Sequence, residues 1–473
     1  MTSLLRKKVV TEQPKGERLA RTLSWPHLVA LGVGAIVGTG ILTLIGVGAD
    51  RAGPAVILSF VIAGAICACA ALAYAEMATM IPASGSAYTY SYVVLGEVIA
   101  WVIGWSLILE YSLVVSTVAV GWSGYIYPLL SPFGFPHWLA QGPPLGGVVN
   151  APAVAIIFVV AGLLTLGTKE SATINALLVV VKIIALAVFV AVALPQFDAA
   201  NLHPFSPFGF TKHAMAGTDG KTVERGVMAA AAIIFFAFYG FDAISTAAEE
   251  TKEPGRDLAI GIVGSMVACV AIYMLVAVAA VGALHFTRFA DSPEPLALIL
   301  RGIGRPGFAT FLAISAVVAL PTVLLGFLFG QSRIFFVMAR DGLLPGALAR
   351  VSSRGTPARI TWLTAVLVAV IAGLMPIDAI AALANAGTLA AFVAVCVCML
   401  VMRRRAPDAP RPFRAPLAPV VGTIGILGCI YLFFSLPTRT ELYFLAWNAI
   451  GLLVYFAYAR PRAGRLQQAV TPG

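Results

Sequence analysis

Residues 32–41 read Gly32-Val33-Gly34-Ala35-Ile36-Val37-Gly38-Thr39-Gly40-Ile41, a run with four glycines and one threonine. The run lies inside an apolar segment that starts at Trp25 and is long enough to cross a bilayer of roughly 30 Å. Glycine is less favourable than alanine in a helix by about 1 kcal/mol, so the run predicts a helix that breaks inside the membrane. The N–H and C=O groups at such a break must face protein or a polar ligand. The alternative is an unbroken helix whose small residues let a neighbouring helix approach closely.

The composition assigns the chain to a broad class. Charged residues make up 11% of the 473 residues, and hydrophobic residues make up 60%. Soluble domains carry about 25% charged residues, so this composition predicts a membrane protein with several spans. No signal-peptide cleavage pattern follows the basic N-terminal tail, so the first apolar segment is expected to remain as a span. The six cysteines fall within expected spans and are interpreted as buried apolar side chains, without a disulfide or metal site.

Apolar runs of about 18 residues or more predict about twelve transmembrane helices and therefore an all-α polytopic membrane protein. The expected spans are 25–49, 53–80, 97–126, 149–167, 171–194, 226–248, 258–284, 306–338, 358–375, 377–402, 417–436 and 440–459. The long segment from Pro195 to Arg225 is rich in Pro, Gly and Phe, and is expected to pack over the outer face. The stretch from Ile81 to Tyr90 is expected to lie along the membrane surface as a gate element.

The distribution of charge predicts the orientation of the chain. An even number of spans places both termini on one side, and most of the 31 lysines and arginines fall on that side. The protein is expected in the plasma (inner) membrane. By the positive-inside rule, its two tails, 1–24 and 460–473, are expected in the cytoplasm. The net charge of +10 is explained by this orientation, so the expected environment is a lipid bilayer and no nucleic acid partner is expected.

The sixth expected span carries an interruption like that of the first. In Phe235-Phe236-Ala237-Phe238-Tyr239-Gly240-Phe241-Asp242, a glycine and an acid stand inside an apolar run. A charge at membrane depth is costly, so Asp242 is interpreted as functional or as part of an internal ion pair. The two interruptions are five spans apart, which predicts a five-plus-five inverted repeat whose broken helices build a binding site at the midplane. The expected transport core covers 25–402, with repeats of about 25–194 and 226–402, followed by peripheral helices at 403–459.

Two further charges and one proline stand inside the spans. Lys182 lies mid-span, where burial would favour its neutral form and make it a candidate proton carrier. The alternative is a permanent cation that tethers its helix to backbone carbonyls of a neighbour. Glu110 is equally central in the third span, where it either accepts a proton or makes a static hydrogen bond. Pro321 is expected to kink the eighth span beside Leu320 and Thr322.

Several motifs occur in order along the chain and resemble one family. They are Gly34 to Ile41, Ala83 to Tyr90, Phe236 to Ala243 with Ala247 to Glu250, Gln331 to Phe336 leading to Arg340 to Pro345, and Arg411 to Pro416. Together they resemble the amino acid–polyamine–organocation superfamily, and within it the bacterial form of the cationic amino acid transporter branch. The resemblance covers about residues 20 to 460.

The resemblance implies a ten-helix core with two peripheral helices and a site at the two breaks. It implies a substrate carboxylate on the N–H groups of Thr39 and Gly40, because a helix N-terminus attracts anions. Lys182 corresponds to a lysine that stands in place of a sodium ion in proton-coupled members. Tyr239 departs from the smaller aliphatic residue usual there, and the segment from His213 to Glu224 is longer than usual. The expected substrate-binding residues are Ile36, Gly38, Thr39, Gly40, Phe236, Ala237, Tyr239, Gly240 and Leu320, and the expected proton-coupling residues are Lys182, Glu110 and Asp242.

The sequence therefore predicts a secondary active transporter that carries an L-amino acid, with the proton as coupling ion and neither sodium nor any cofactor. Leu320 and the aromatic residues near the breaks favour a small or medium neutral side chain over a cationic one, whose charge would lose its hydration. The alternatives are an amino acid/amine exchanger, uptake of arginine or lysine, and a non-transporting sensor. A channel or an enzyme is not expected, because the sequence contains neither repeated pore-lining rings nor a nucleophile–base set.

Overall fold

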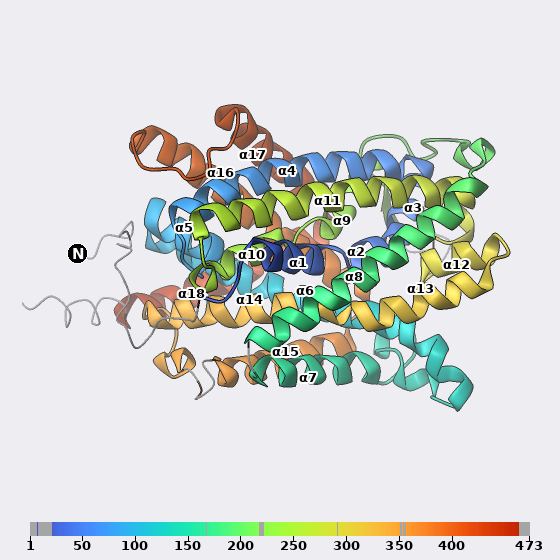
Figure 1. Ribbon diagram of the computed structural model, residues 1–473, viewed down its shortest axis with the longest axis horizontal. Coiled ribbons are helices and arrows are strands. Elements are labelled where there is room, and N and C mark those ends of the chain that lie inside the picture. The colour runs from blue at the N-terminus through green and yellow to red at the C-terminus, as the bar shows by residue number, and fades with distance from the viewer. Residues whose placement is uncertain are drawn as a thin grey trace, which may run out of the picture.

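The computed structural model describes residues 7, 21–166, 168–216, 222–290, 292–350, 352 and 356–462. The expected tails, 1–24 and 460–473, lie largely outside these residues, as does the stretch 217–221 of the outer segment, so their assignments stay predictions. The described chain folds into a bundle of helices that run along the long axis of the molecule (Figure 1).

The helices and strands have the following bounds. The first part of the chain forms α1 (Trp25–Ile36), α2 (Thr39–Leu42), α3 (Leu44–Ala52), α4 (Val56–Met80), α5 (Ser86–Val94), α6 (Glu97–Leu130), α7 (Ala151–Leu166) and α8 (Thr168–Ala193). The middle forms β1 (His213–Ala216), β2 (Thr222–Arg225), α9 (Val227–Ile234), the 3-10 turn η7 (Phe235–Ala237), α10 (Phe241–Thr246), the 3-10 turn η8 (Ala248–Glu250) and α11 (Pro254–Ala283). The last part forms α12 (Pro295–Gly302), α13 (Pro306–Ala319), α14 (Pro321–Arg340), α15 (Ala358–Leu374), α16 (Ile377–Arg405), α17 (Ala418–Phe433) and α18 (Thr438–Val454).

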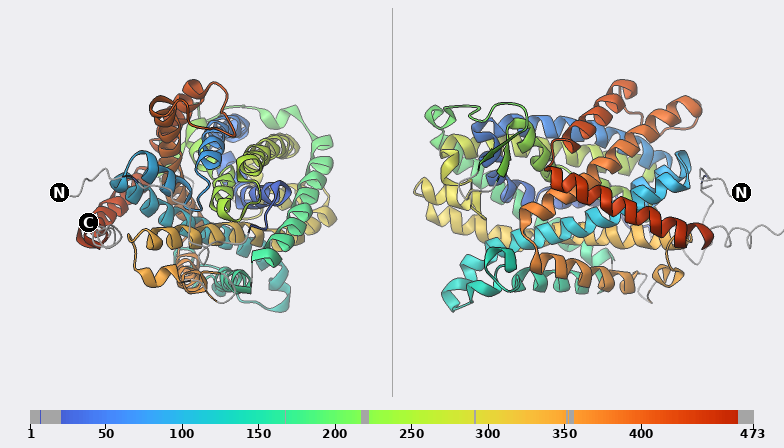
Figure 2. Two further views of the ribbon diagram at one scale, coloured as in Figure 1. Left: turned by 60° about the vertical axis from the view of Figure 1, so that its left-hand side comes forward. Right: turned by 180° about the vertical axis from the view of Figure 1, so that it is seen from behind.

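The number of apolar helical stretches confirms the all-α polytopic fold. Within the described ranges, nine helical stretches are long and apolar enough to cross a membrane. Three shorter apolar helices complete the set, at Ala151–Thr165, Ala358–Leu374 and Ala418–Phe433. Two of these spans are interrupted, one between α1 and α2 and one between η7 and α10. The division of the core into two five-span repeats stays a prediction. The helices α17 and α18 follow the other spans and lie on the outside of the bundle (Figure 2).

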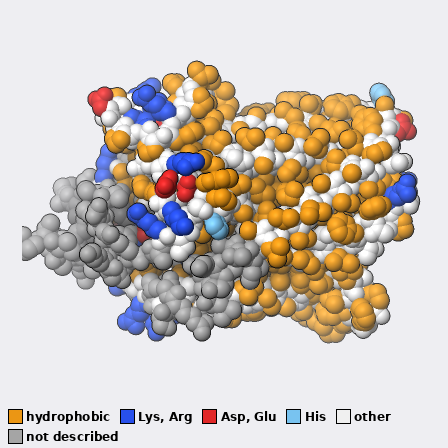
Figure 3. Space-filling view, in the orientation of Figure 1, with side chains coloured by type: hydrophobic (Ala, Val, Ile, Leu, Met, Phe, Trp, Pro, Cys, Tyr) orange, Lys and Arg blue, Asp and Glu red, His pale blue; other side chains and the backbone are white. Residues whose placement is uncertain are grey.

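The periodicity of α8 shows how the bundle separates lipid from protein. Leu177, Val180 and Ile184 are at least half exposed, at a helical spacing on one side of α8. Val179 and Lys182 are buried on the opposite side. Apolar side chains that face outward in this way form a broad apolar belt over the visible face (Figure 3). The ammonium of Lys182 therefore points into the bundle and not toward the lipid.

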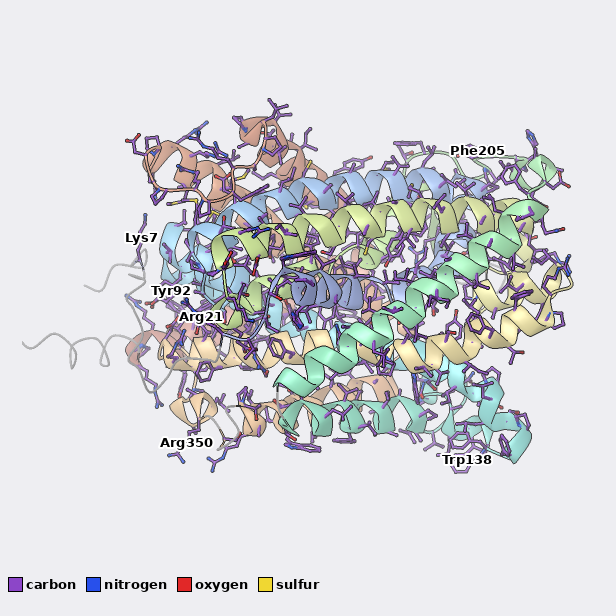
Figure 4. The ribbon with its side chains drawn as sticks, viewed as in Figure 1. Lys7, Arg21, Tyr92, Trp138, Phe205 and Arg350 are labelled. Carbon is purple, nitrogen blue, oxygen red and sulfur yellow. The ribbon has the colours of Figure 1, made fainter. Side chains whose placement is uncertain are left out.

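The two ends of the bundle differ in charge. The labelled side chains of Arg21, Tyr92 and Arg350 lie at one end, and those of Trp138 and Phe205 lie at the other (Figure 4). Lysine and arginine gather at the first of these ends (Figure 3), which is called the basic end below. The opposite end carries the β1–β2 pair and is called the hairpin end.

The outer segment has a definite structure where it is described. The strands β1 and β2 pair in antiparallel fashion, with His213 opposite Arg225. Lys212 donates to the carbonyl of Leu436 at the α17–α18 turn, at 2.5 Å, and forms an ion pair with Glu224 at 3.6 Å. Arg225 pairs with Asp50 of α3 at 2.9 Å. As expected, the segment packs over one end of the bundle.

The stretch from Ile81 to Tyr90 leads into α5 near the basic end. Its second half, from Ser86, belongs to α5, and Ser86, Tyr88 and Tyr90 are fully buried. The helix α5 packs against α6, α16 and α10. Its position along the membrane surface and its role as a gate element stay predictions.

Candidate functional site

The first break lies where the glycine-rich run predicts it. The helix α1 ends at Ile36, Val37 is extended with φ −74° and ψ 99°, and α2 begins at Thr39. The N–H group of Val37 still donates to the carbonyl of Val33, at 2.9 Å. Because the chain is not helical at Val37 and Gly38, the later carbonyls of α1, from Gly34 to Ile36, have no helical N–H partner one turn on. The first N–H groups of α2, at Thr39 and Gly40, similarly have no carbonyl one turn earlier.

Side chains from other helices satisfy the carbonyls at this break. The ammonium of Lys182 donates to the carbonyl of Gly34 at 2.8 Å and to that of Val37 at 2.6 Å. The hydroxyl of Tyr273, from α11, donates to the carbonyl of Ile36 at 2.7 Å. A carbonyl has two lone pairs, so Ile36 keeps one of them for another donor. The lysine predicted from sequence is thus fixed at the unwound part of the first span.

The second break lies between η7 and α10, and Asp242 stabilises it. Gly240 has φ +123°, a conformation that favours glycine. The carboxylate of Asp242 accepts from the backbone N–H of Gly240 at 3.0 Å and from the hydroxyl of Tyr111 at 2.6 Å. Both oxygens of this buried carboxylate are therefore held by neighbouring protein groups. The acid closes the break and joins it to α6.

The glycines of the two breaks are required where the broken helices meet. A Cβ atom on Gly40 would lie 2.3 Å from the Cα atom of Ala237. A Cβ atom on Gly240 would lie 2.9 Å from the backbone carbon of Ala35. Each break thus leaves room for the backbone of the other. Close packing through small residues, the alternative weighed from sequence, occurs here together with the break.

Apolar and aromatic side chains line the region beside the breaks. The ring of Tyr239 contacts that of Phe236 edge-on at 5.0 Å between centroids and that of Phe327 at 5.9 Å. Leu320 is 1% exposed and stands at the joint between α13 and α14, where the proline produces the expected interruption. The hydroxyl of Tyr239 makes no hydrogen bond within the described residues. These side chains form an apolar wall with one polar tip.

Glu110 is buried on the side of α6 that packs against α16. It is 0% exposed, and a Cβ atom on Gly387 would lie 2.9 Å from the Cβ atom of Glu110. Thr388 lies beside the carboxyl group. Glu110 also interacts electrostatically with Asp242 and with Tyr239. The structure therefore brings both acids of the sequence prediction together near the second break, while Lys182 stands at the first.

Three contacts to the breaks were not found from the sequence. Tyr111 and Tyr273 hold Asp242 and Ile36, and Asn385 of α16 donates to the carbonyl of Ala232 at 2.8 Å. Asn385 carried a signal, because an amide in an apolar span usually bonds to a neighbouring helix. Tyrosines in apolar spans give no comparable signal.

The basic end of the bundle is closed beneath this site. The guanidinium of Arg333 pairs with Glu250 at 3.2 Å, and both side chains are under 5% exposed. Arg340 pairs with Glu249 at 3.3 Å. The N–H group of Leu23, just before α1, donates to the carbonyl of Glu250 at 3.0 Å. These contacts tie α14, η8 and the start of α1 together.

The described residues contain no group of three or more His, Cys, Asp or Glu side chains that could hold a metal ion. The polar groups at the first break include its backbone groups together with the side chains of Lys182, Tyr273 and Thr322. Two interrupted spans lie face to face inside a bundle of membrane helices, and this arrangement is typical of membrane transporters.

Comparison with known proteins then gives the family. The family model described as "Amino acid permease" matches residues 23–457, so the chain belongs to the amino acid permease family within the superfamily that the motifs resemble. The chain is 43% identical to the branched-chain amino acid permease BcaP of Bacillus subtilis, with 97% of this chain and 98% of that protein covered. It is 41% identical to the methylthioribose transporter of the same bacterium, with the same coverage.

Plant proteins of the family are also similar. The chain is 38% identical to cationic amino acid transporter 2 of Arabidopsis thaliana. The aligned region covers 86% of this chain and 64% of that protein. The family and these relatives confirm the sequence prediction of a membrane permease for amino acid transport. The roles of individual site residues stay predictions.

Proposed function

We propose that this chain takes up neutral L-amino acids together with protons by alternating access, as a secondary active transporter. The observation that carries the proposal is the ammonium of Lys182, which lies 2.8 Å and 2.6 Å from the two carbonyls at the first break. A side chain that gains and loses a proton is thereby bonded directly to the backbone of the substrate site.

The backbone of the two breaks would hold the charged groups common to all amino acids. The N–H groups of Thr39 and Gly40 would receive the carboxylate, because they have no carbonyl partner within α2. The amino group would donate to the free lone pair of Ile36 and to carbonyls of η7 at Phe236 and Ala237. In this arrangement the backbone binds the amino and carboxylate groups of the substrate, and the side chain of the substrate contacts the apolar wall.

The wall favours a neutral side chain. Leu320, Phe236 and Tyr239 offer no countercharge. Asp242 is already bonded to Gly240 and Tyr111, so it is not free to bind a distal cation. A lysine or arginine substrate would leave its charge unpaired, at a cost of several kcal/mol. The branched-chain permeases among the relatives support this choice.

Lys182 would couple the proton to the conformation of the break. In its charged form the ammonium makes charge-assisted hydrogen bonds to both carbonyls, and these weaken when the proton leaves. A sodium ion at the same carbonyls would be repelled by the charged ammonium, so sodium is not proposed. Glu110 is a second candidate proton carrier, whereas the contacts of Asp242 favour a structural role.

The proposed setting is the plasma (inner) membrane, with both termini in the cytoplasm. The arginine-rich ends of α14 and α16 lie at the basic end, which the positive-inside rule assigns to the cytoplasm. The ion pairs of Arg333 and Arg340 would then close the cytoplasmic side of the site. No protein partner is proposed.

A substrate panel tests the proposal. Purified protein in proteoliposomes would be given labelled leucine in competition with isoleucine, alanine, arginine and methylthioribose. We expect leucine, isoleucine or alanine to compete better than arginine. Stronger competition by arginine would mean that Glu110 or Asp242 faces the substrate, and stronger competition by methylthioribose would mean that the zwitterion is not the recognised group. Uptake that requires amino acid or amine inside the vesicle would identify an exchanger instead.

A further inference from the structure

Four buried hydroxyl groups gather between α4, α5 and α10, and they are called the hydroxyl cluster here. They belong to Tyr74, Ser86, Tyr90 and Ser245, all 0% exposed. The hydroxyl oxygens of Ser245 and Ser86 are 2.9 Å apart, and the rings of Tyr74 and Tyr90 meet edge-on at 6.2 Å between centroids. The cluster thus joins three helices on the side of the site that faces the basic end.

The two tyrosine hydroxyls of the cluster lack a well-directed hydrogen bond. Ser86 lies close to the hydroxyl of Tyr74, and Ser245 lies close to that of Tyr90, but neither pair has the geometry of a hydrogen bond. A buried polar group without a partner costs about 1–3 kcal/mol. Buried groups of this kind are usually satisfied by internal water molecules, each of which bonds to two to four polar atoms.

The backbone at Ser86 is strained in the way that places its hydroxyl in the cluster. Ser86 has φ +51°, and it is one of two non-glycine residues with positive φ among those described. Strain of this kind persists where the surrounding structure holds it, and it concentrates at functional positions. Packing alone would not select the two tyrosines, because phenylalanine would fill the same volumes without an unpaired hydroxyl.

The cluster lies next to the two buried acids. The hydroxyl of Ser245 donates to the backbone carbonyl of Asp242, three residues earlier in α10, at 2.6 Å. Tyr74 interacts electrostatically with both Asp242 and Glu110. The acids and the cluster are therefore neighbours within the bundle.

The hydroxyls continue from the cluster toward the basic end. Thr89 and Ser91 of α5 are buried, and their hydroxyls make no hydrogen bond of good geometry. Charged groups on this side include Asp341 and Glu97, which accept from Tyr88 and Tyr92 of α5, and the ion pairs of Glu249 with Arg340 and of Glu250 with Arg333. A polar route thus leads from the buried acids, along α5, to the charged groups at the basic end.

We propose that the hydroxyl cluster binds water and, with this water, carries a coupling proton from Glu110, the second candidate proton carrier, to the basic end. The inference rests on the proposed proton coupling. Each oxygen of the route accepts one proton from the preceding group and releases its own to the next. One proton enters and one leaves, so no other reactant is consumed.

Variants that remove only hydroxyl groups test the transport part of the proposal. Tyr74→Phe and Tyr90→Phe keep the rings that pack between α4 and α5. Tyr125→Phe is the matched control, because Tyr125 is also fully buried but donates to the carbonyl of Leu42 near the hairpin end. Proteoliposomes would be assayed for uptake of labelled leucine driven by a pH gradient, and for leucine exchange at equal pH, in which the proton need not be released.

The expected result is a split between the two assays. Gradient-driven uptake should fall by about tenfold in the double variant, because losing about one hydrogen bond's free energy from the proton-transfer step slows that step about tenfold. Exchange should stay within about twofold. The control should lower both rates together or neither. Equal loss of uptake and exchange in the double variant, or loss of neither, would overturn the proposal. If the unmodified protein moves leucine without protons, the proposed function itself fails.

Labelling of internal water provides a test that does not depend on transport. Brief X-ray radiolysis of the purified protein produces hydroxyl radicals from bound water, and mass spectrometry locates the oxidised side chains. Tyr74 and Tyr90 should be modified although they are fully buried. Tyr273 is equally buried but bonded to Ile36, so it should be protected. Equal protection of all three tyrosines would show that the cluster is dry and would overturn the proposal.

Discussion

Replacing Lys182 by methionine removes the ammonium and keeps a side chain of similar length. The substitution deletes the hydrogen bonds to the carbonyls of Gly34 and Val37. If Lys182 carries the coupling proton, the variant should lose uptake driven by a pH gradient. It should still bind substrate, because the N–H groups of Thr39 and Gly40 do not contact the lysine.

The size of the effect on binding follows from what remains at the break. The carbonyl of Gly34 keeps a second donor, the hydroxyl of Thr322 at 3.3 Å. Val37 loses the partner that the structure gives it, at a cost of about 1–3 kcal/mol for a buried carbonyl. The variant should therefore unfold at a lower temperature. Its substrate affinity should fall by about two- to twelvefold when about half of this cost reaches the bound state.

The assay compares leucine binding with gradient-driven leucine uptake in the same preparation. Lys212→Met is the matched control, because Lys212 also donates to two backbone carbonyls, those of Phe434 and Leu436, but at the hairpin end. The control should retain gradient-driven uptake. Acid-stimulated uptake that persists undiminished in a folded Lys182→Met protein would refute the role of Lys182 as proton carrier.

Three further substitutions address selectivity, packing and closure. Leu320→Ser should widen the pocket and improve competition by arginine at least severalfold in the uptake assay; unchanged competition would remove Leu320 from the wall. Gly40→Leu should abolish leucine binding and lower thermal stability, because its Cβ atom would lie 2.3 Å from the Cα atom of Ala237, and normal affinity would contradict this packing. Arg333→Gln should leave Glu250 buried without its cation, which typically lowers stability by about 3–5 kcal/mol. The basic end should then open more often, so cysteines introduced there should react faster with a thiol reagent.

The breaks and the spans could be predicted because their signals are local. Glycines near Gly38 and the acid at Asp242 stand out in apolar runs, and hydropathy alone finds most of the span positions. Lys182 could be placed inside the bundle because a lone charge at the centre of a span has no route to water. For these features the relevant information lies within one or two turns of helix.

The partners at the breaks could not be predicted because they join distant parts of the chain. Tyr111 is 131 residues from Asp242, and Tyr273 is 237 residues from Ile36. The fit of Gly40 against Ala237 likewise depends on how two spans meet. A tyrosine in an apolar span gives no sign of which helix it will contact, so these roles required the fold.

The surroundings of α5 show the same limit. Its serines, threonine and tyrosines lie between two spans, and the sequence does not show which helices they contact. The structure buries them against α6, α10 and α16. A polar stretch between two spans is therefore compatible with a membrane surface or with a polar interior, and the choice depends on tertiary contacts.

The measurement that tests the central claim most directly is simultaneous uptake of labelled leucine and of protons into sodium-free proteoliposomes. With acid outside, the unmodified protein should accumulate leucine above the external concentration, and the internal pH should fall as leucine enters. A protonophore should abolish the accumulation, and added sodium should not change it. Leucine that only equilibrates, or that accumulates without proton entry, would contradict proton-coupled transport through the site held by Lys182.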